Sequence, residues 1–352
     1  MILGKKKNVI GLDIGSSSVK LVELREGKNG YKLQHLAISP LPPEAIVDGA
    51  LMDSVTIIDT IRDLVTSTTK TRDVVTSVSG HSVIVKKITL PFMTERELRD
   101  SINWEAERHI PFDINDVNLD FQILGAGSEN PDMMDVILVA AKKDIINDYV
   151  SVVMEAGLSP LVVDIDAFAL ENMVGINYDI DRDDMVAIAN VGASVTNITI
   201  LKNNVSAFTR DVFKGGHQIT EEIQRQLHVD YEEAEKMKVG QKADSSSQGV
   251  VEGALKSASE SLAVEIGNSI DFFQSTGTYQ KISRLFLSGG GSKVKDFDVI
   301  LQQHIGVPVE MANPFKRIEY SEKDFDLEYL RDIGPVMAVG VGLASRKKGD
   351  RK

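Results

Sequence analysis

The sequence predicts an α/β protein with two related lobes, each carrying a small-residue turn that can hold a phosphate group. The first observation is the stretch Gly11–Leu24, in which apolar residues flank a Gly-Ser turn and indicate a β-hairpin. The second is the stretch Val186–Ile200, which repeats the order of apolar strand, small-residue turn and apolar strand. The third is the length of 352 residues, which is enough for two domains with separate cores. Two similar hairpins far apart in one chain suggest two lobes that face a common ligand.

The first hairpin combines groups that suit a phosphate chain and its metal ion. Its turn, Gly15–Ser18, offers backbone N–H groups and hydroxyls that can approach one anion closely. Asp13 ends the first strand and Lys20 begins the second. A carboxylate oxygen is a ligand that Mg²⁺ prefers, and an ammonium group binds phosphate as a point charge. A polar hairpin without a ligand is the alternative, and this hairpin alone does not separate the two interpretations.

The second hairpin favours the phosphate interpretation, because it aligns with the first. The chain contains no Gly-x-x-x-x-Gly-Lys-Ser/Thr loop and no Gly-x-Gly-x-x-Gly after a strand, so a P-loop or dinucleotide fold is disfavoured. The aligned pairs are Asn190 with Asp13, Gly192 with Gly15, Ser194 with Ser17 and Ile198 with Leu21.

The composition excludes several classes of function. There are 39 Lys and Arg residues against 52 Asp and Glu residues. The resulting net charge of -13 argues against general nucleic-acid binding, which needs a basic surface. The chain has no Cys, so disulfides and thiolate metal sites are excluded. No apolar run reaches the roughly 20 residues of a membrane span. The six His residues are scattered without His-Glu-x-x-His spacing, which disfavours a zinc site.

The first lobe begins with strands and continues with a helix and another strand. After the hairpin, residues 31–38 read as a third strand, and Pro residues then break the pattern. Residues 54–66 place apolar side chains at helical spacing, and residues 73–79 read as a strand. Strands followed by a helix and a further strand are typical of the start of an α/β lobe.

From about Ser82 the pattern changes to a β-α-β-β-α block, which we interpret as a subdomain inserted in the first lobe. Thr94 and Glu97 form a capping-box pattern at the start of a helix that runs to His109. Gly157 follows the second helix as a C′ residue. The predicted strands cover residues 83–90, 118–124 and 135–140, and the second helix covers residues 144–156.

The second lobe follows an acidic linker at residues 179–184. Before it, residues 161–166 read as a strand and 167–174 as a helix. After the second hairpin come a strand at 205–212, mostly helical sequence at 221–280, a strand at 282–287 and a final helix at 333–344. The predicted units are a lobe-one core (1–80, 161–184 and 334–352), the inserted subdomain (81–160), a lobe-two core (185–220 and 281–333) and a helical subdomain of lobe two (221–280).

The order of these turns resembles the actin-like ATPase superfamily, which includes actin, the Hsp70 chaperones, the sugar kinases and FtsA. The resemblance implies a two-lobed, ribonuclease H-like fold. Gly11–Lys20 looks like the first phosphate motif, Asn190–Thr196 like the second and Ser288–Ser292 like the adenosine motif. Asp164–Glu171 and Gly334–Leu343 look like the two helices that connect the lobes. Each motif alone is weak, and the five in this order are a specific combination.

The inserted block narrows the resemblance to the type IV pilus assembly protein PilM family. The similar segments are Leu41–Gly49, Trp104–Phe112, Leu119–Gly125 and Glu155–Leu158, and the resemblance covers almost the whole chain. An insert of this kind is what FtsA-like members carry. The resemblance implies a cytoplasmic protein, peripheral at the inner membrane, that binds ATP or ADP with Mg²⁺.

The partner implied by the resemblance is the N-terminal cytoplasmic tail of PilN, held in a groove beside the inserted subdomain. A link to the pilus motor ATPases is implied as well. Contact with the membrane would then be made through partners, and nucleic acid is not an expected partner.

The resemblance also assigns roles to individual residues. Asp13 matches the carboxylate that holds Mg²⁺ through water, and Asp166 matches the residue that positions the attacking water. Glu235 and Lys238 share a helix face and would face the nucleotide; an ordinary surface pair is the alternative. The other implied nucleotide-binding positions are Gly15, Ser16, Ser17, Ser18, Lys20, Asn190, Gly192, Ala193, Ser194, Thr196, Gly215, Gly216, Gly289, Gly290, Gly291 and Ser292.

The sequence departs from the hydrolytic pattern of the superfamily at the second phosphate motif. Asn190 replaces the usual Asp, and Ala193 stands where actin has another Asp. Both changes remove carboxylates that help to hold metal and water, and phosphoryl transfer depends on such positioning. We therefore expect ATP to bind and to be hydrolysed slowly or not at all. His217 replaces an acidic residue common after the Gly-Gly turn, and the sequence suggests no role for it.

Three functions remain open at this point. The leading hypothesis is a scaffold in which closure of the lobes on ATP gates partner binding. An active ATPase or small-molecule kinase on the same fold is the second, and the missing carboxylates count against it. An FtsA-like, filament-forming membrane tether is the third. It would need an amphipathic membrane helix, which residues 346–352 do not supply.

Overall fold

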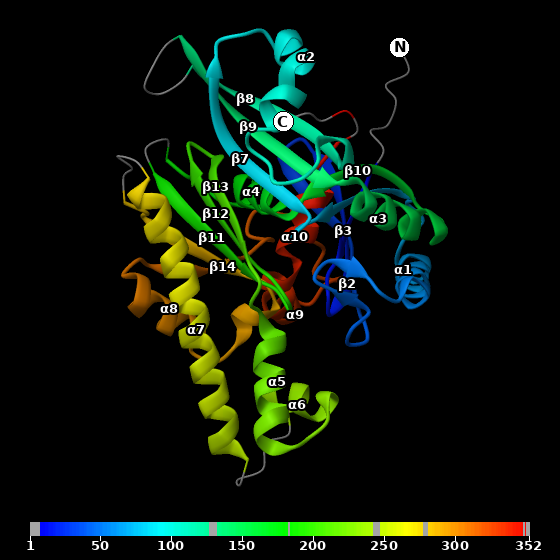
Figure 1. The fold of residues 1–352 in the computed structure, drawn as a ribbon. Coiled ribbons are helices and arrows are strands. Elements are labelled where there is room, and N and C mark those ends of the chain that lie inside the picture. The colour runs from blue at the N-terminus through cyan, green and yellow to red at the C-terminus, as the bar shows by residue number, and fades with distance from the viewer. Residues whose placement is uncertain are drawn as a thin grey trace.

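The computed structural model has two lobes, each built on a five-stranded sheet, and a three-stranded sheet at one end of the molecule (Figure 1). It describes residues 8–126, 132–181, 184–241, 247–276, 281–347 and 349. In spatial order, the first sheet contains β10 (Ser159–Ile165), β6 (Asp73–Val78), β1 (Ile10–Ile14), β2 (Ser18–Gly27) and β3 (Gly30–Pro40). The second contains β13 (Val205–Val212), β12 (Thr196–Lys202), β11 (Met185–Val191), β14 (Arg284–Ser288) and β15 (Val309–Met311). A short hairpin of β4 (Ile46–Val47) and β5 (Ala50–Leu51) accompanies the first sheet.

The two large sheets repeat one topology. In each, a central strand pairs antiparallel with the strand that follows it and parallel with a later one: β1 with β2 and β6, and β11 with β12 and β14. The hairpin registers are also equivalent, since Asp13 lies opposite Lys20 and Asn190 lies opposite Asn197. The predicted pair of related hairpins is therefore present in the fold.

Helices cover the outer faces of the sheets and fill the space between them. α1 (Ser54–Thr68) and α3 (Lys143–Glu155) cover the first sheet, and α7 (Gln248–Ser275) and α8 (Phe297–Ile305) cover the second. α4 (Asp166–Asn177) and α10 (Ala338–Ala344) lie between the two sheets. The remaining helices are α2 (Glu95–Ala106), α5 (Gly216–Leu227), α6 (Tyr231–Lys238), α9 (Leu327–Ile333) and the short 3₁₀ helices η1 (Ile114–Asp116), η2 (Gly290–Lys293) and η3 (Gly334–Met337).

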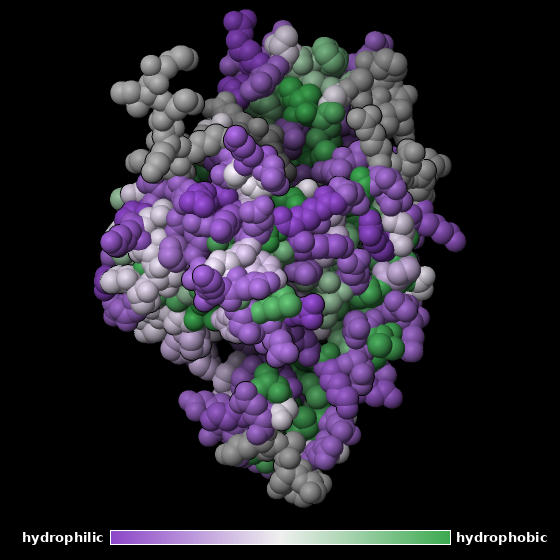
Figure 2. Space-filling view, turned by 180° about the vertical axis from the view of Figure 1, so that it is seen from behind, coloured by the Kyte–Doolittle hydropathy of each residue, from purple (hydrophilic) through white to green (hydrophobic). Residues whose placement is uncertain are grey.

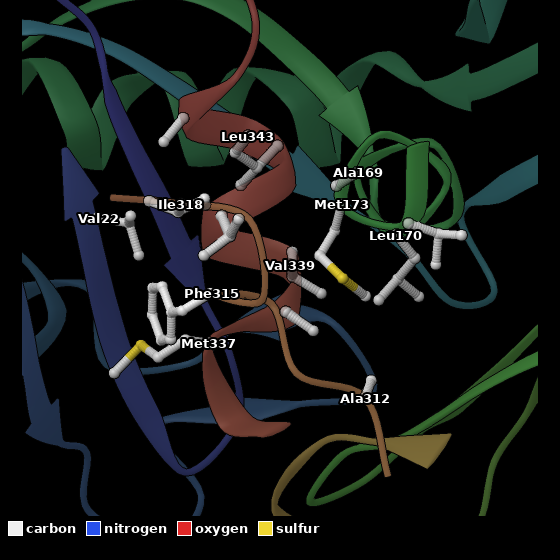
Figure 3. Packing of buried hydrophobic residues seen from close by; sticks show 14 of the residues in the cluster. Val22, Ala169, Leu170, Met173, Ala312, Phe315, Ile318, Met337, Val339 and Leu343 are labelled. Carbon is white, nitrogen blue, oxygen red and sulfur yellow. The ribbon is translucent and has the colours of Figure 1, made fainter. Parts of the chain in front are cut away.

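The central core joins the two lobes through α4 and α10. Figure 3 shows Ala169 and Met173 of α4 facing Val339 and Leu343 of α10. The same cluster includes side chains of both sheets, such as Val22 of β2, and residues of β11 and β14. Burial of this apolar surface holds the two sheets on opposite sides of one helix pair.

Glycines set the distance between these central elements. A Cβ atom at Gly342 of α10 would lie 1.8 Å from the carbonyl oxygen of Ala169 in α4. A Cβ atom at Gly11 of β1 would lie 2.2 Å from the carbonyl oxygen of Gly340. Backbone therefore meets backbone at both contacts, and a side chain at either position would force the elements apart.

The inserted block forms its own sheet at the top of Figure 1, in the order β7 (Val83–Pro91), β9 (Met133–Lys142) and β8 (Val117–Ala126). α2 packs on one face of this sheet, with Leu98 and Ile102 in a shared apolar core. The predicted capping box of Thr94 and Glu97 is present at the start of α2. The helix ends at Ala106 instead of His109, because the chain tightens into i→i+3 hydrogen bonds before Pro111.

The last helix of the predicted block packs mainly on lobe one. Tyr149, Val152 and Val153 of α3 lie in the lobe-one core, against α1 and β10. α3 begins immediately after β9, so it connects the insert directly to lobe one. Val83, Val85 and Val139 of the insert strands pack against the same cluster, so α3 joins the insert to lobe one.

The final helical segment has two parts. It begins as the 3₁₀ helix η3, which contains Pro335 near its start, and continues as α10. Residues 348 and 350–352 of the basic tail lie outside the described residues. In the described part of the chain, no helix has both the length and the apolar character that a bilayer crossing requires.

We expect Gly342→Ala to destabilise the protein, because the added methyl group would overlap the carbonyl oxygen of Ala169. The expected loss in the free energy of unfolding is about 1–3 kcal/mol, measured by denaturant unfolding. Gly253→Ala in α7 is the matched control, since no heavy atom lies within 4 Å of its added Cβ. Helix propensity predicts a small gain there. Equal losses in both variants would contradict the packing argument.

Candidate functional site

A cavity of about 630 Å³ lies between the two lobes; we call it the cleft. Its volume falls within the range of about 300–1,000 Å³ typical of small-molecule sites. It is lined by the two hairpin turns, the start of α4, the start of α5 and the loop before η2. The predicted site residues that line it are Asp13, Gly15, Ser16, Ser17, Lys20, Asp166, Asn190, Gly192, Ala193, Ser194, Gly216, Glu235, Lys238, Gly289, Gly290 and Gly291.

The first hairpin presents a preformed ion pair beside its turn. The N–H of Gly15 donates to the carbonyl oxygen of Ser18 at 3.1 Å and closes the turn. Lys20 Nζ lies 3.2 Å from Asp13 Oδ2, and the Lys20 side chain is 11% exposed. Register places the two residues opposite each other on β1 and β2, so the pair is fixed by the sheet. An ammonium group and a carboxylate are therefore held at the edge of a hydroxyl-rich turn.

The second hairpin closes in the same way and anchors a helix. The N–H of Gly192 donates to the carbonyl oxygen of Val195 at 2.9 Å. The N–H of Gly216 then donates to the carbonyl oxygen of Gly192 at 3.0 Å. This bond fixes the N-terminus of α5 against the turn, and that end of a helix attracts anions.

His217 supports the second turn, a role that the sequence did not reveal. The backbone N–H of His217 donates to the carbonyl oxygen of Ala193 at 2.8 Å, and the ring Nδ1 lies 3.3 Å from Ser194 Oγ. Burial, followed by the charge of Lys238, lowers the pKa of the His217 imidazole. The ring is therefore neutral near pH 7 and can share a hydrogen bond with Ser194.

Asp166 lies in the cleft at the first position of α4. Ser77 Oγ donates to Asp166 Oδ1 at 2.5 Å. Burial, followed by the negative charge of Asp13, raises the pKa of Asp166 to about 6. Tyr149 also lines the cleft, and burial together with the charges of Asp166 and Asp13 raises the pKa of its hydroxyl. Two carboxylates that interact in this way favour a bound cation or proton.

These carboxylates fit a magnesium ion that is held mainly by water and phosphate oxygens. Mg²⁺ keeps several waters and takes one or two protein carboxylates in phosphate-binding sites. Asp13 is the carboxylate at the first turn, and Asp166 is close enough to feel its charge. Among the described residues, no group of three or more His, Asp or Glu side chains converges as a metal site. The two carboxylates thus suit a Mg²⁺ ion that binds together with a phosphate ligand.

Glu235 and Lys238 form a short ion pair in the wall of the cleft. Lys238 Nζ lies 2.6 Å from Glu235 Oε2. Thr220 Oγ1 of α5 donates to the same carboxylate at 2.7 Å and lies 3.0 Å from Lys238 Nζ. The pair is therefore an i,i+3 contact within α6, as in the alternative of an ordinary surface pair. It also ties α6 to α5 and lines the cleft.

Four predicted residues do not line the cleft: Ser18, Thr196, Gly215 and Ser292. Thr196 Oγ1 donates to the carbonyl oxygen of Lys214 at 2.7 Å, and Ser292 Oγ donates to that of Gly289 at 2.6 Å. Ser18 closes the first turn through its carbonyl oxygen, and Gly215 packs tightly under the second turn. These residues shape the turns from behind the cleft wall.

Other residues of the cleft were missed by the sequence analysis. Asn197 could have been found, because it aligns with Lys20 once the two hairpins are matched. Lys293 and Asp332 form an ion pair of 2.6 Å beside the glycine loop, but they come from segments far apart in the chain. The missed polar, aromatic and glycine positions that line the cleft are Gly49, Ser77, Ser79, Gly80, Tyr149, Asn197, His217, Gln241, Lys293 and Asp332.

A second cavity of about 840 Å³ lies between the insert and lobe one; we call it the groove. Ile137, Val139 and Ala141 of β9 line it, whereas alternate residues of the same strand pack under α2. β8 and β10, which border it, are edge strands of their sheets. Figure 2 shows hydrophobic residues gathered at the top of the molecule, bordered by hydrophilic ones. The groove thus has an apolar strip along β9, and charged residues such as Arg99, Asp120 and Arg346 also line it. Such a groove beside edge strands suits an extended peptide.

The cleft and the groove share a wall. Val78, the last residue of β6, lines both cavities. Ile165 at the end of β10 lines the groove, and Asp166, the next residue, lines the cleft. On α3, Ile146 lines the groove and Tyr149 lines the cleft. Any displacement of this wall therefore reaches both cavities.

A family model for the type IV pilus assembly protein PilM matches residues 11–348. The chain belongs to the PilM family. A solved structure described as the PilM-PilN type IV pilus biogenesis complex has a TM-score of 0.86 and 31% sequence identity to this chain, over 96% of this chain and 98% of that chain. This finding confirms the family that the inserted block suggested.

Two more distant structures share the fold of this PilM family member. The ethanolamine utilization protein EutJ from Carboxydothermus hydrogenoformans has a TM-score of 0.58 and 16% identity, over 96% of this chain and 88% of that chain. MreB5 of Spiroplasma citri bound to ADP has a TM-score of 0.50 and 13% identity, over 96% of this chain and 95% of that chain. Together with the two repeated sheets, they confirm the predicted actin-like, two-lobed fold.

We expect Asp166→Asn to stabilise the nucleotide-free protein at pH 7. Folding raises the pKa of Asp166 from its ordinary value of 3.8 to about 6, so the folded state favours the protonated form. Ionisation then costs stability above that range, and Asn, which resembles the protonated acid, avoids the cost. The gain should be smallest below about pH 4, rise between about pH 4 and 6 and stay constant above.

The measurement is denaturant unfolding of both proteins across this pH range. Asp63→Asn, at an exposed position of α1 outside the cleft, is the control. A gain that does not depend on pH, or an equal gain in the control, would contradict the assignment.

Proposed function

We propose that this protein is an ATP-binding scaffold of the type IV pilus assembly machinery, in which nucleotide in the cleft controls peptide binding in the groove. The observation that carries the proposal is the wall shared by the two cavities, made by Val78, Ile165 and Asp166. The proposed peptide is the N-terminal cytoplasmic tail of PilN, and the similar PilM-PilN complex supports this choice. The protein would work at the cytoplasmic face of the inner membrane, held there by partners that include the pilus motor ATPases.

The cleft has the groups that a nucleoside triphosphate needs. Lys20 and the N–H groups of the first turn would hold phosphate from one lobe, and the second turn with the N-terminus of α5 would hold it from the other. Bound Mg²⁺ would neutralise phosphate charge, with Asp13 as its protein carboxylate. On the adenosine side, Gly289 and Gly291 give a wall of bare backbone that packs on Val191.

Slow hydrolysis follows from the groups that the second turn lacks. Ala193 has no polar side chain, and Asn190 is neutral and donates its Nδ2 to Asn197 at 3.1 Å. Asp166 remains near the first turn and accepts a hydrogen bond from Ser77. The cleft thus keeps the groups for binding but has fewer carboxylates to orient a metal ion and an attacking water.

The groove supports binding of an extended tail. Such a peptide would pair with an edge strand through its backbone and place alternate apolar side chains against Val139 and its neighbours. Phe168 and Glu171 of α4 line the opposite side. Glu171 Oε2 also accepts the N–H of Ser206 in β13 at 3.1 Å, which ties this side of the groove to lobe two.

Gating of the groove would follow from the position of α4. Asp166 at the start of the helix lies in the cleft, whereas Phe168 on the same turn and Glu171 on the next turn line the groove. Closure of the lobes on nucleotide would move α4 relative to β9. A ligand shifts such an equilibrium by as much as its affinities for the two states differ.

We expect purified protein mixed with Mg-ATP to retain intact ATP and to release phosphate slowly. Asp13→Asn should weaken Mg-ATP binding by about tenfold or more, since it removes the charged ligand at the first turn. Bound nucleotide and free phosphate are quantified over time, with Asp63→Asn as the control. Rapid phosphate release would favour the enzyme alternative, and absence of binding would remove the nucleotide part of the proposal.

We expect Val139→Glu to weaken binding of a labelled PilN-tail peptide by about tenfold or more, because a charge would enter the apolar strip that β9 contributes to the groove. Val264→Glu on the outer face of α7, where the side chain is 42% exposed, is the matched control. Fluorescence anisotropy with and without Mg-ATP gives both affinities. Unchanged binding in Val139→Glu would place the peptide elsewhere, and equal wild-type affinities with and without Mg-ATP would remove the gating.

A further inference from the structure

Asn190 belongs to a series of hydrogen bonds, here called the hydrogen-bond chain, that runs from the end of β14 to the other lobe. Ser288 Oγ donates to Asn190 Oδ1 at 3.1 Å, and Asn190 Nδ2 donates to Asn197 Oδ1 at 3.1 Å. Asn197 Nδ2 donates to Asp211 Oδ1 at 2.8 Å. Asp211 Oδ2 accepts the N–H of Gly80 at 2.6 Å. The two bonds of Asn190, to Ser288 and to Asn197, are buried, and the two bonds of Asp211 are partly buried.

The carboxylate of Asp211 fixes the direction of the whole chain. An ionised carboxylate can only accept, so Asn197 must present its NH₂ group to Asp211 and its oxygen to Asn190. Asn190 must then present its NH₂ group to Asn197 and its oxygen to Ser288. Burial raises the pKa of Asp211, and the hydrogen bonds from Asn197 and Gly80 lower it.

The hydrogen-bond chain also crosses from one lobe to the other. Asn190, Asn197 and Asp211 lie in lobe two, whereas Gly80 follows β6 of lobe one and directly precedes the insert. Gly80 has a φ of 86°, a backbone conformation that few other residues adopt. In this conformation its N–H donates to Asp211. Next to this bond, the rings of His81 and Phe213 stack at 3.2 Å between centroids with an interplanar angle of 7°. The second hairpin is thus bonded to the base of the insert.

We infer that Asp211 is a positioning residue of the cleft, acting through Asn197 to orient Asn190 and through Gly80 to hold the lobes together. The inference deepens the proposed function and rests on it for the part that concerns nucleotide. It explains why Asn stands at position 190: the hydrogen-bond chain needs a side chain there that donates to Asn197 and accepts from Ser288. A carboxylate can only accept, so Asn190→Asp would set two acceptors against each other.

The inference predicts rescue by a reversed chain. When Asn190→Asp is combined with Asp211→Asn, the new amide at position 211 would accept from Gly80 and donate to Asn197. Asn197 would then turn over and donate to the new carboxylate at position 190. Every donor would again meet an acceptor, with the same number of charges as in the wild-type protein. In Asp211→Asn alone, the side-chain amides of Asn197 and Asn190 can both rotate to restore every bond, because the Ser288 hydroxyl can accept as well as donate. The effect of Asp211→Asn should therefore be smaller than that of Asn190→Asp.

The experiment compares Asn190→Asp, Asp211→Asn and the double variant by thermal unfolding without nucleotide and by the release rate of fluorescent mant-ATP with Mg²⁺. We expect Asn190→Asp to lower the Tm by a few degrees and to speed release roughly tenfold, because the buried bond to Asn197 is lost and the side chains of the second hairpin lose their fixed orientation. The double variant should return both values close to those of the wild-type protein. If Asn190→Asp does not fold, recovery of folded protein in the double variant replaces the Tm.

The control double variant is Asn190→Asp with Asp332→Asn. The second substitution removes a carboxylate that lines the cleft but takes no part in the hydrogen-bond chain. Equal rescue by Asp332→Asn, or no rescue by Asp211→Asn, would overturn the inference, because charge alone or another effect would then explain the loss. Thermal unfolding needs no nucleotide, so it tests the chain of bonds even if the wild-type protein fails to bind ATP and the proposed function is wrong.

Discussion

The contact between α4 and α10 limits how the two lobes can be arranged, because backbone atoms already touch there. Gly342 lies against the carbonyl oxygen of Ala169, and Gly11 of β1 lies against that of Gly340. Both helices carry parts of the cleft: α4 begins at Asp166, and Val339 of α10 lines the cleft. The geometry of the cleft therefore depends on a helix contact that has no room for side chains.

The two hairpins use one backbone design for two kinds of chemistry. At equivalent positions, lobe one has the ion pair of Asp13 and Lys20, and lobe two has the hydrogen-bonded amides of Asn190 and Asn197. Of the two hairpins, the first thus carries the charge that can bind a metal ion and phosphate. The second hairpin is neutral at these positions, and its order comes from bonds that extend to Asp211 and the opposite lobe.

Local patterns in the sequence predicted most of the fold and many residues of the cleft. The two turns and the capping box of Thr94 depend on neighbours in the chain, so their residues are readable from sequence. Thr196 was predicted but lies behind the wall, whereas Asn197 was missed and lines it, because successive residues of a strand point to opposite faces. Tyr149 enters the cleft through long-range packing of α3, which no local pattern encodes.

The wall shared by the cleft and the groove has a consequence for the order of assembly. Coupling between two binding sites is reciprocal: a nucleotide that strengthens peptide binding by some factor is itself bound more tightly by the same factor when the peptide is present. Under the proposed function, a partner seated against α4 would then raise the affinity for nucleotide, and its departure would lower it. Occupancy of the cleft would report whether the partner is in place.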